Sequence, residues 1–147
     1  MLSNQNRPIG TGLAGGISQP AILPHVVVSV SGNDKVRTHF TFTNIGLTPV
    51  FSVAVETVRH AGQTMDFETI DELPPGASLT CLSIIHPVTN NDPHWTFEFW
   101  SDSGEEVSVP FVVRYKDEDR RPIVMKNTLR WNRRRAFLVP DKAPEPA

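Results

Sequence analysis

The sequence has 147 residues, of which 39% are hydrophobic and 20% are charged, and its formal net charge is −2. This length predicts a single domain, and the small net charge shows that the chain as a whole is not a polyelectrolyte. The chain has one cysteine, Cys81, so no disulfide can form within it. That argues against a disulfide-stapled secreted module and favours a reducing compartment or a particle assembled inside a cell.

Residues 1–23 are predicted to form an extended arm, because Gly, Pro and small polar residues offer little apolar surface to bury. Isolated apolar residues such as Ile9, Leu13 and Ile17 are interpreted as anchors on a partner's surface. Gly and polar residues interrupt every short apolar run, so we recognise no secretory signal peptide. No stretch approaches the roughly 20 apolar residues that span a bilayer. We therefore expect no membrane span, and a location in a virion or in the cytoplasm.

Alternating apolar and polar residues predict a series of short strands after the arm. Eight predicted strands cover about residues 26–30, 36–42, 51–55, 65–67, 79–85, 95–99, 107–115 and 123–131. The turn sequences SGND, LPPGAS, SDSGEE and KDEDRRP lie between them. Regularly spaced strands with turn chemistry predict an all-β fold. We expect a single antiparallel immunoglobulin-like β-sandwich of about 7–8 strands over residues 24–132, followed by a Pro-rich C-terminal tail over residues 133–147.

Several expectations concern individual strands. Residues 79–85 (LTCLSII) are apolar on both faces, which predicts a central strand. Phe51, Val53 and Val55 are expected to share one buried face. Pro110 lacks an N–H, so its strand should be an edge there or carry a bulge. In the loop after residue 43, Asn44 and Gly46 both tolerate left-handed backbone, which predicts a compact connection.

The turn residues also resemble those of a known family. Asn44, Gly46 and Pro49 match an N-x-G turn followed by Pro, and Leu73, Pro75 and Gly76 match an L-x-P-G turn. A later Y-x-D matches Tyr115 and Asp117. Over roughly residues 26–131 this pattern resembles bacterial and phage immunoglobulin-like domains of the CARDB-like kind. The resemblance implies an immunoglobulin-like fold and is nearly silent on function.

The residue types that carry catalysis or bind metals form no recognisable motif. No histidine pair has the spacing of a metal site, although His86 and His94, with Asp92 between them, are a weak alternative. Cys81 lies in an apolar strand and is interpreted as packing. The abundant carboxylates lie in turns or on outward positions, and no nucleophile, phosphate or dinucleotide motif appears. We therefore expect a protein that is not an enzyme and has no cofactor.

The three tryptophans are candidates for contact with a ligand. Trp95 and Trp131 fall on apolar faces and are predicted to lie in the core. Trp100 alternates away from Phe97 and Phe99, so it is a candidate for touching a ligand or partner. An immunoglobulin-like ligand- or carbohydrate-binding module that uses Trp100 is therefore the alternative function.

Charge is divided unevenly along the chain. Residues 61–113 contain nine acidic and no basic residues, whereas residues 114–135 contain nine basic and three acidic residues. Acidic and basic strands pairing across a sheet would explain this division. A bipolar surface that steers assembly with neighbours would explain it too. The stretch RWNRRR at 130–135 is also a candidate for nucleic acid, but the negative net charge and the lack of a recognised motif make that partner unlikely.

These observations favour a non-catalytic structural or interaction protein. We interpret it as an accessory or decorating component of a larger assembly, such as a phage virion capsid. Its partners would be capsid protein or other copies of itself. The candidate partner-binding residues are Ile9, Leu13, Ile17, Trp100, Arg130, Arg133, Arg134 and Arg135.

Overall fold

The computed structural model describes residues 23–31, 39–88, 106–132 and 136–147, and these form short antiparallel strands. The strands are β2 (Val26–Ser31), β3 (His39–Asn44), β4 (Val50–Val55), β5 (Val58–His60), β6 (Gln63–Asp66), β7 (Ile70–Leu73), β8 (Ser78–Leu82), β9 (Ile84–His86), β10 (Val107–Lys116), β11 (Pro122–Trp131), β12 (Ala136–Pro140) and β13 (Glu145–Pro146). No helix occurs among the described residues. The described residues therefore contain no helix that is long and apolar enough to cross a membrane.

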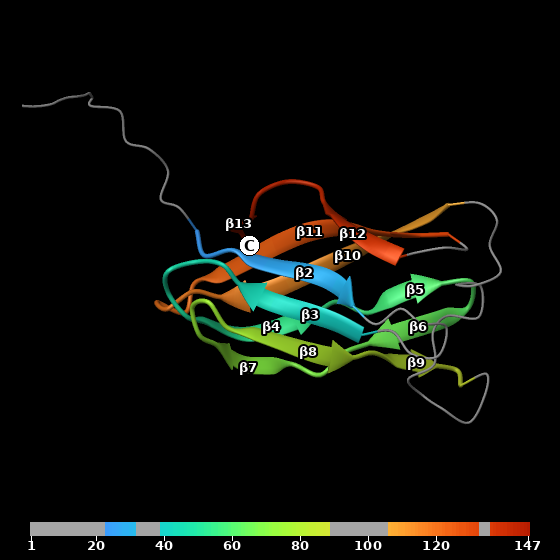
Figure 1. The fold of residues 1–147 in the computed structure, drawn as a ribbon, viewed down its shortest axis with the longest axis horizontal. Helices are drawn as coiled ribbons and strands as arrows, with labels where there is room; N and C mark the ends of the chain where they lie inside the picture. The colour runs from blue at the N-terminus through green and yellow to red at the C-terminus, as the bar shows by residue number, and fades with distance from the viewer. Residues whose placement is uncertain (1–22, 32–38, 89–105, 133–135) are drawn as a thin grey trace, which may run out of the picture.

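The strands form three sheets (Figure 1). The largest has the order β12-β11-β10-β4-β7, and β13 also pairs with β11. A second sheet, β2-β3-β8, lies in front of it in the view of Figure 1, and β5-β6-β9 forms the third. This confirms the all-β prediction with antiparallel sheets in a sandwich-like arrangement. The immunoglobulin-like strand order stays a prediction.

The core fills the space between the six-stranded sheet and the β2-β3-β8 sheet. Phe40 on β3 stacks on Phe111 of β10 with ring centroids 5.3 Å apart. Phe67 meets both rings edge-on, at 4.9 Å and 5.7 Å. Trp131 is fully buried, as its place on an apolar face predicted. Aromatic pairs with these geometries add to the free energy gained from burying apolar area.

The β10–β11 hairpin matches its prediction most closely. Val109, Phe111, Val113 and Tyr115 are buried at alternate positions, as period-2 alternation requires. The buried Asp117 closes the turn, because its carboxylate accepts hydrogen bonds from the backbone N–H of Asp119 and of Arg121, each at 2.9 Å. The predicted turn KDEDRRP is therefore held by one acidic side chain.

Pro110 sits in this hairpin where β11 is the one described strand that pairs with β10. It lies opposite Thr128, and the register of β10 with β4 begins at Val113. The missing N–H of Pro110 therefore costs no hydrogen bond to β4. This agrees with the expectation that the strand is an edge at Pro110.

The expected alternation of β4 is wrong. Val50 and Val53 are the buried residues, whereas Phe51 and Val55 are only partly buried. The cause is Ser52, whose φ is +53°. This left-handed residue breaks the period-2 pattern, and the register with β10 shifts between Arg114 and Lys116. Sequence alternation alone does not reveal such an irregularity.

The C-terminal residues also depart from expectation. Residues 136–140 were assigned to a tail outside the sandwich, but the structure places them in β12, which pairs with β11 from Trp131 to Asn127. Glu145 and Pro146 form β13 beside Val124 and Ile123. The sheet therefore extends past residue 132. Pro140 and Pro146 lie at strand ends, where a missing N–H is tolerated.

The loop after β3 is compact, as predicted, but for a different reason. Neither Asn44 nor Gly46 has a positive φ, whereas Gly76 in the neighbouring LPPGAS turn has a φ of +78°. Asn44 is fully buried. Its Nδ2 donates to the carbonyls of Thr48 and Leu73, and its Oδ1 accepts from the Gly46 N–H, all at 2.9 Å.

Backbone hydrogen bonds complete this arrangement. The Asn44 N–H donates to the Ala77 carbonyl at 3.0 Å, and the Gly76 N–H donates to the Asn44 carbonyl at 2.8 Å. A Cβ on Gly46 would come within 3.2 Å of Asn44 Oδ1, so a larger residue there would disturb the bond. We call Asn44 and its partners in residues 73–77 the Asn44 clasp, since they tie the end of β7 to the start of β8.

Candidate interaction surface

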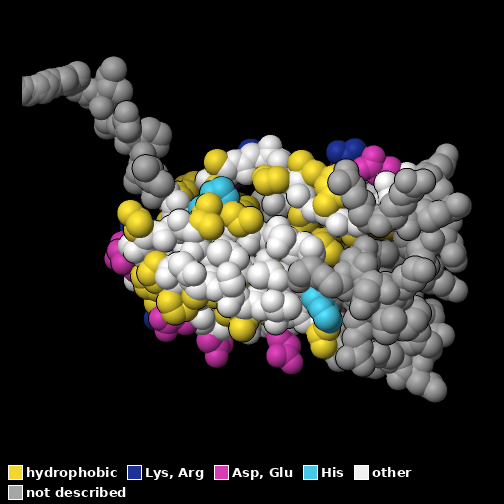
Figure 2. All heavy atoms as spheres, viewed as in Figure 1, with side chains coloured by type: hydrophobic (Ala, Val, Ile, Leu, Met, Phe, Trp, Pro, Cys, Tyr) yellow, Lys and Arg dark blue, Asp and Glu magenta, His cyan; other side chains and the backbone are white. Residues whose placement is uncertain are grey.

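The outward face of the β2-β3-β8 sheet is neutral and rich in hydroxyl groups. The register places Ser29, Thr41 and Thr80 in one row across the sheet. Thr41 and Thr80 share a hydrogen bond of 2.9 Å between their hydroxyls, and Thr43 and Ser78 share one of 2.7 Å in the next row. In Figure 2 this face is mostly white and yellow, with acidic and basic side chains gathered at its rim. A charge-free centre resembles an interface core more than an ordinary surface.

The second unusual feature is β8 itself, which ends the β2-β3-β8 sheet. Sequence analysis predicted a central strand; among the described strands β8 pairs only with β3, so it is an edge of the described sheet. Leu79 lies opposite Phe42 and Cys81 opposite Phe40, so both face inward. Leu79 is nevertheless 45% exposed. In the described part of the chain the sandwich is therefore open along β8.

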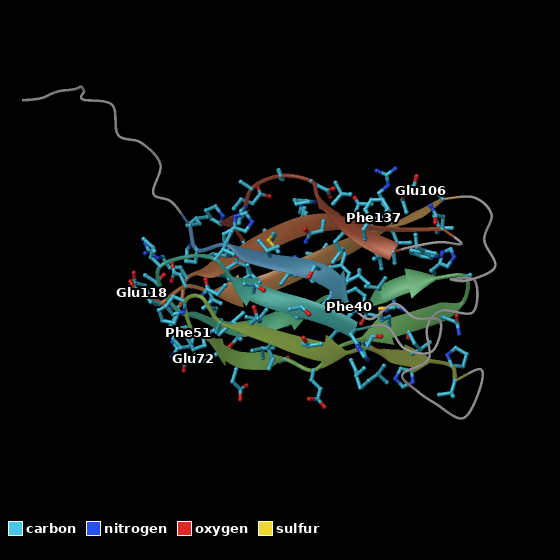
Figure 3. All side chains as sticks on the ribbon, in the orientation of Figure 1. Phe40, Phe51, Glu72, Glu106, Glu118 and Phe137 are labelled. Carbon is cyan, nitrogen blue, oxygen red and sulfur yellow. The ribbon has the colours of Figure 1, made fainter. Side chains whose placement is uncertain are left out.

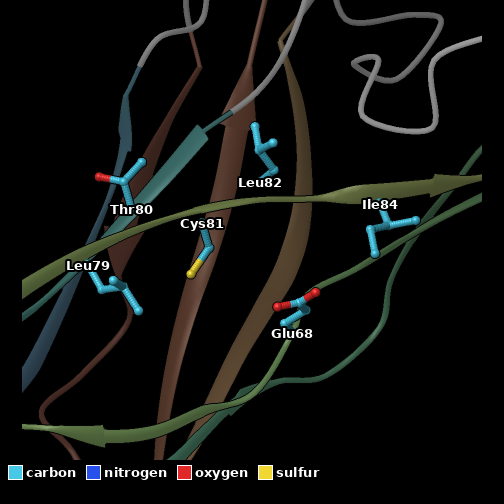
Figure 4. Close-up of a pocket in the computed structure, with 6 residues that line it drawn as sticks. All are labelled: Glu68, Leu79, Thr80, Cys81, Leu82 and Ile84. Carbon is cyan, nitrogen blue, oxygen red and sulfur yellow. The ribbon is translucent and has the colours of Figure 1, made fainter.

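A cleft of about 430 Å³ occupies this opening. Its lining consists of Glu68, Leu79, Thr80, Cys81, Leu82 and Ile84. Figure 4 shows the Leu79 and Cys81 side chains extending from β8 toward the side on which Glu68 lies. We call these residues and the free edge of β8 the β8 cleft. Its size is within the range of sites that bind small molecules or peptide side chains.

Cys81 is the reactive side chain nearest to this opening. Burial, and secondarily the negative charge of Glu68, raise the pKa of the Cys81 thiol. A thiol with a raised pKa stays protonated at neutral pH and is a poor nucleophile. The β8 cleft therefore has the character of a binding surface and lacks an activated cysteine.

The opposite side of the sandwich is closed. There β12 packs beside β2, although the two strands belong to different sheets. Ala136 and Leu138 of β12 are partly buried against the core. The two lateral sides of the molecule thus differ, because β12 covers one and no described strand covers the other.

Arg130, which was predicted to bind a partner, is engaged within the chain. Its Nε and Nη2 lie 2.7 Å and 2.9 Å from the two carboxylate oxygens of Glu106. Its guanidinium carbon lies 5.6 Å from the centre of the Phe137 ring. Figure 3 places Glu106 and Phe137 at one corner of the molecule. Such half-exposed ion pairs contribute little to stability.

The charge division therefore has a local explanation only in part. The Arg130–Glu106 pair joins the acidic block (residues 61–113) to the basic block (residues 114–135). Arg114 pairs instead with Glu56, at 2.5 Å, and Arg121 pairs with Asp117 and Asp119 of its own turn. For the other charged residues, cross-strand pairing and a bipolar surface both stay predictions.

The other predicted site residues lie outside the described residues. These are Ile9, Leu13, Ile17, Trp100, Arg133, Arg134 and Arg135. His94, Asp92 and Trp95 also lie outside them. Among the residues that the structure does describe, no group of three His, Cys, Asp or Glu side chains is arranged to hold a metal ion.

Sequence reasoning missed the β8 cleft. One signal was available, because residues 78–82 contain no charged residue and five strand residues without charge suit either a central strand or a covered edge. Periodicity cannot separate these two cases. Comparison of the chain with protein families, with curated proteins and with solved structures gave no match.

Proposed function

We propose that this chain is a non-catalytic structural or interaction protein, an accessory component of a larger assembly. A phage virion capsid is the setting that the sequence interpretation favours. One observation carries the proposal: an uncharged strand edge, which no other described strand covers, borders a cleft whose apolar Leu79 is 45% exposed. Natural proteins usually protect such edges, because exposed edges pair with other chains. An edge left without that protection is suited to a partner.

Two further features support a protein partner over a small substrate. The hydroxyl-rich face of β2-β3-β8 is contiguous with the edge, since Ser78 and Thr80 belong to both. The Cys81 thiol, whose pKa is raised, lacks the activation that catalysis by cysteine requires. An interface of flat sheet plus edge would bury far more area than the cleft alone.

The test is recovery of the native assembly. The protein is isolated from its source under mild conditions, and the particle fraction is compared across a salt series with a variant carrying Arg133→Glu, Arg134→Glu and Arg135→Glu. We expect the parent to co-purify with a particle or partner, and the variant to be released at lower salt because charge attraction is screened. A parent that elutes as a monomer under all conditions would contradict the proposal.

The alternative, a ligand- or carbohydrate-binding module, is favoured by one observation, the volume of the β8 cleft. A sugar or small apolar ligand that raises the melting temperature of the parent, but not of Leu79→Lys, would support this alternative. Stabilisation of both proteins would locate the ligand elsewhere.

A further inference from the structure

We propose that residues 9–17 of one copy add as an extra strand to the free edge of β8 in a second copy, with alternate side chains filling the β8 cleft. This deepens the proposed function and rests on it, because it names the partner as another copy of the chain. Strand addition is a common way for an extended segment to bind a sheet, with backbone hydrogen bonds giving affinity and side-chain pockets giving specificity.

The first step is the edge. β8 carries no charged residue and no Pro between Ser78 and Leu82, and its side away from β3 is unpaired among the described strands. Within the described parts of the chain no strand bonds to the backbone N–H and C=O groups on that side, and an added strand would bond to them. Beneath the edge, Leu79 and Cys81 face the cleft. A strand placed beside β8 would cover both.

The second step is the segment. Residues 9–17 read IGTGLAGGI, in which odd positions carry Ile9, Thr11, Leu13, Gly15 and Ile17. Every even position is Gly or Ala. An extended chain sends alternate side chains to opposite faces. This segment would therefore present one mainly apolar face and one nearly bare face, which suits a strand inserted along a narrow opening.

Size and charge agree with this pairing. Residues 9–19 contain no Pro and no charge, so the segment, like β8, is neutral and can donate backbone hydrogen bonds throughout. A cavity of about 150 Å³ holds one benzene. A cleft of about 430 Å³ therefore has room for about two or three side chains of the segment's apolar face.

The third step concerns which copy supplies the segment. To reach β8 of its own domain, the chain would have to reverse between residue 17 and Val26 and cross the ends of β2 and β3. Pro20 and Pro24 restrict Gln19 and Leu23 to extended conformations, which opposes such a reversal. Pro24 is also held in place, since its carbonyl accepts a hydrogen bond from the Tyr115 hydroxyl at 2.7 Å. A second copy avoids the reversal, and head-to-tail addition then generates rings or filaments.

Cys81 makes the proposal testable, because it is the single cysteine and it lines the cleft. We would introduce one further cysteine into the full chain, at an odd position (Thr11→Cys or Gly15→Cys) or at an even one (Ala14→Cys or Ser18→Cys). An added oxidant traps neighbouring thiols as disulfides. Products are read on a non-reducing gel and by mass spectrometry of mixed isotope-labelled and unlabelled copies.

We expect Cys81 to be linked between copies at one or both odd positions, at least about tenfold more than at either even position. The reason is that a disulfide needs Cβ atoms about 3.5–4.5 Å apart, and even side chains point to the other face. In the best odd variant, adding Leu79→Lys should abolish the link. Adding Leu47→Lys, on an apolar residue that is 95% exposed outside the cleft, should leave it unchanged.

Three results would overturn the proposal. Equal linking at odd and even positions would show contact without an added strand. Disulfides within one chain would show that each copy covers its own edge. If no position links while the protein still binds its particle, strand addition is refuted and the proposed function stands. If the parent itself does not bind a particle, that result counts against the proposed function.

Discussion

The two lateral sides of this sandwich are held by different means. On one side β12 packs beside β2, and Ala136 and Leu138 contact the core. On the other side β8 has no strand beyond it among the described residues, and the Asn44 clasp ties it to β7 at one end. The comparison teaches that one domain can close one side by packing a strand against its core and fix the end of the other side by a buried hydrogen-bond network.

The strongest way to break this comparison is to remove the strands that close the first side. Deleting residues 136–147 uncovers the edge of β11 and loses the partly buried Ala136 and Leu138. We expect a loss of about 3 kcal/mol or more, which lowers the melting temperature by about 10 °C. Thermal unfolding followed by circular dichroism measures it. Deleting residues 1–20 is the control, and we expect the domain to melt as the parent does; equal losses in both deletions would contradict the prediction.

The Asn44 clasp should be nearly as sensitive. Asn44→Ala leaves the carbonyls of Thr48 and Leu73 and the Gly46 N–H without their side-chain partner. Losing several bonds to a fully buried amide should cost about 2–4 kcal/mol. Urea unfolding gives the free energy of unfolding directly. The neighbouring Ile45→Ala, on a residue that is 57% exposed, should cost less than about 0.5 kcal/mol, and similar costs for the two would refute the clasp.

Two matched Leu→Lys substitutions compare the side that β12 covers with the β8 side. Leu138→Lys places an ammonium where β12 contacts the core, and we expect a loss of about 1–2 kcal/mol. Leu79→Lys lies at the open side, where the longer side chain can reach water, and should cost less than about 0.5 kcal/mol in the dilute monomer. Urea unfolding of both variants decides the matter. A larger loss for Leu79→Lys would mean that the β8 side is sealed.

Tyr115 gives the smallest effect and a pH signature. Burial raises its pKa to about 12, against a smaller lowering by a hydrogen bond to the Val26 backbone. A phenol whose pKa is raised on folding stabilises the fold fully below its unfolded pKa of about 10, and that stabilisation is lost as pH rises through about 12. Tyr115→Phe should cost about 1 kcal/mol at neutral pH, from the lost bond to Pro24.

The measurement is direct, because Tyr115 is the single tyrosine. Its phenolate absorbance should titrate near pH 12 in the folded parent. Between pH 10 and 12 the parent should lose more stability than Tyr115→Phe, which cannot ionise. A midpoint near the ordinary value of about 10 would show that the hydroxyl is solvated.

Much of the fold was predictable because it depends on local chemistry. The β10–β11 hairpin follows from alternation and from a turn rich in acids, and Gly76 adopts the positive φ that its turn needs. The β4 irregularity was not predictable, since Ser52 is an ordinary strand residue whose left-handed φ depends on its neighbours. Residues 136–140 were missed because prolines around a short apolar run suggest a tail, and only pairing with β11 makes them a strand.

Sequence reasoning also found only part of the candidate site. Arg130 was predicted to bind a partner, whereas the structure shows an ion pair with Glu106 of the same chain. The β8 cleft was not predicted, because five uncharged residues in a row fit a central strand as well as an edge. Asn44 was predicted to make a compact loop through left-handed backbone, but it acts through hydrogen bonds, and its bond to Leu73, 29 positions away, is one that no local pattern encodes.

By itself, the sequence determined the class of structure: antiparallel strands, the positions of the main turns, and an aromatic core. These follow from side-chain periodicity and from the backbone preferences of Gly and Pro, which act within a few residues. Only the tertiary structure decided which strand became an edge, which side β12 closed, and where Leu79 remained half exposed. Those outcomes depend on the order in which distant strands meet, and sheet order is a property of the whole chain.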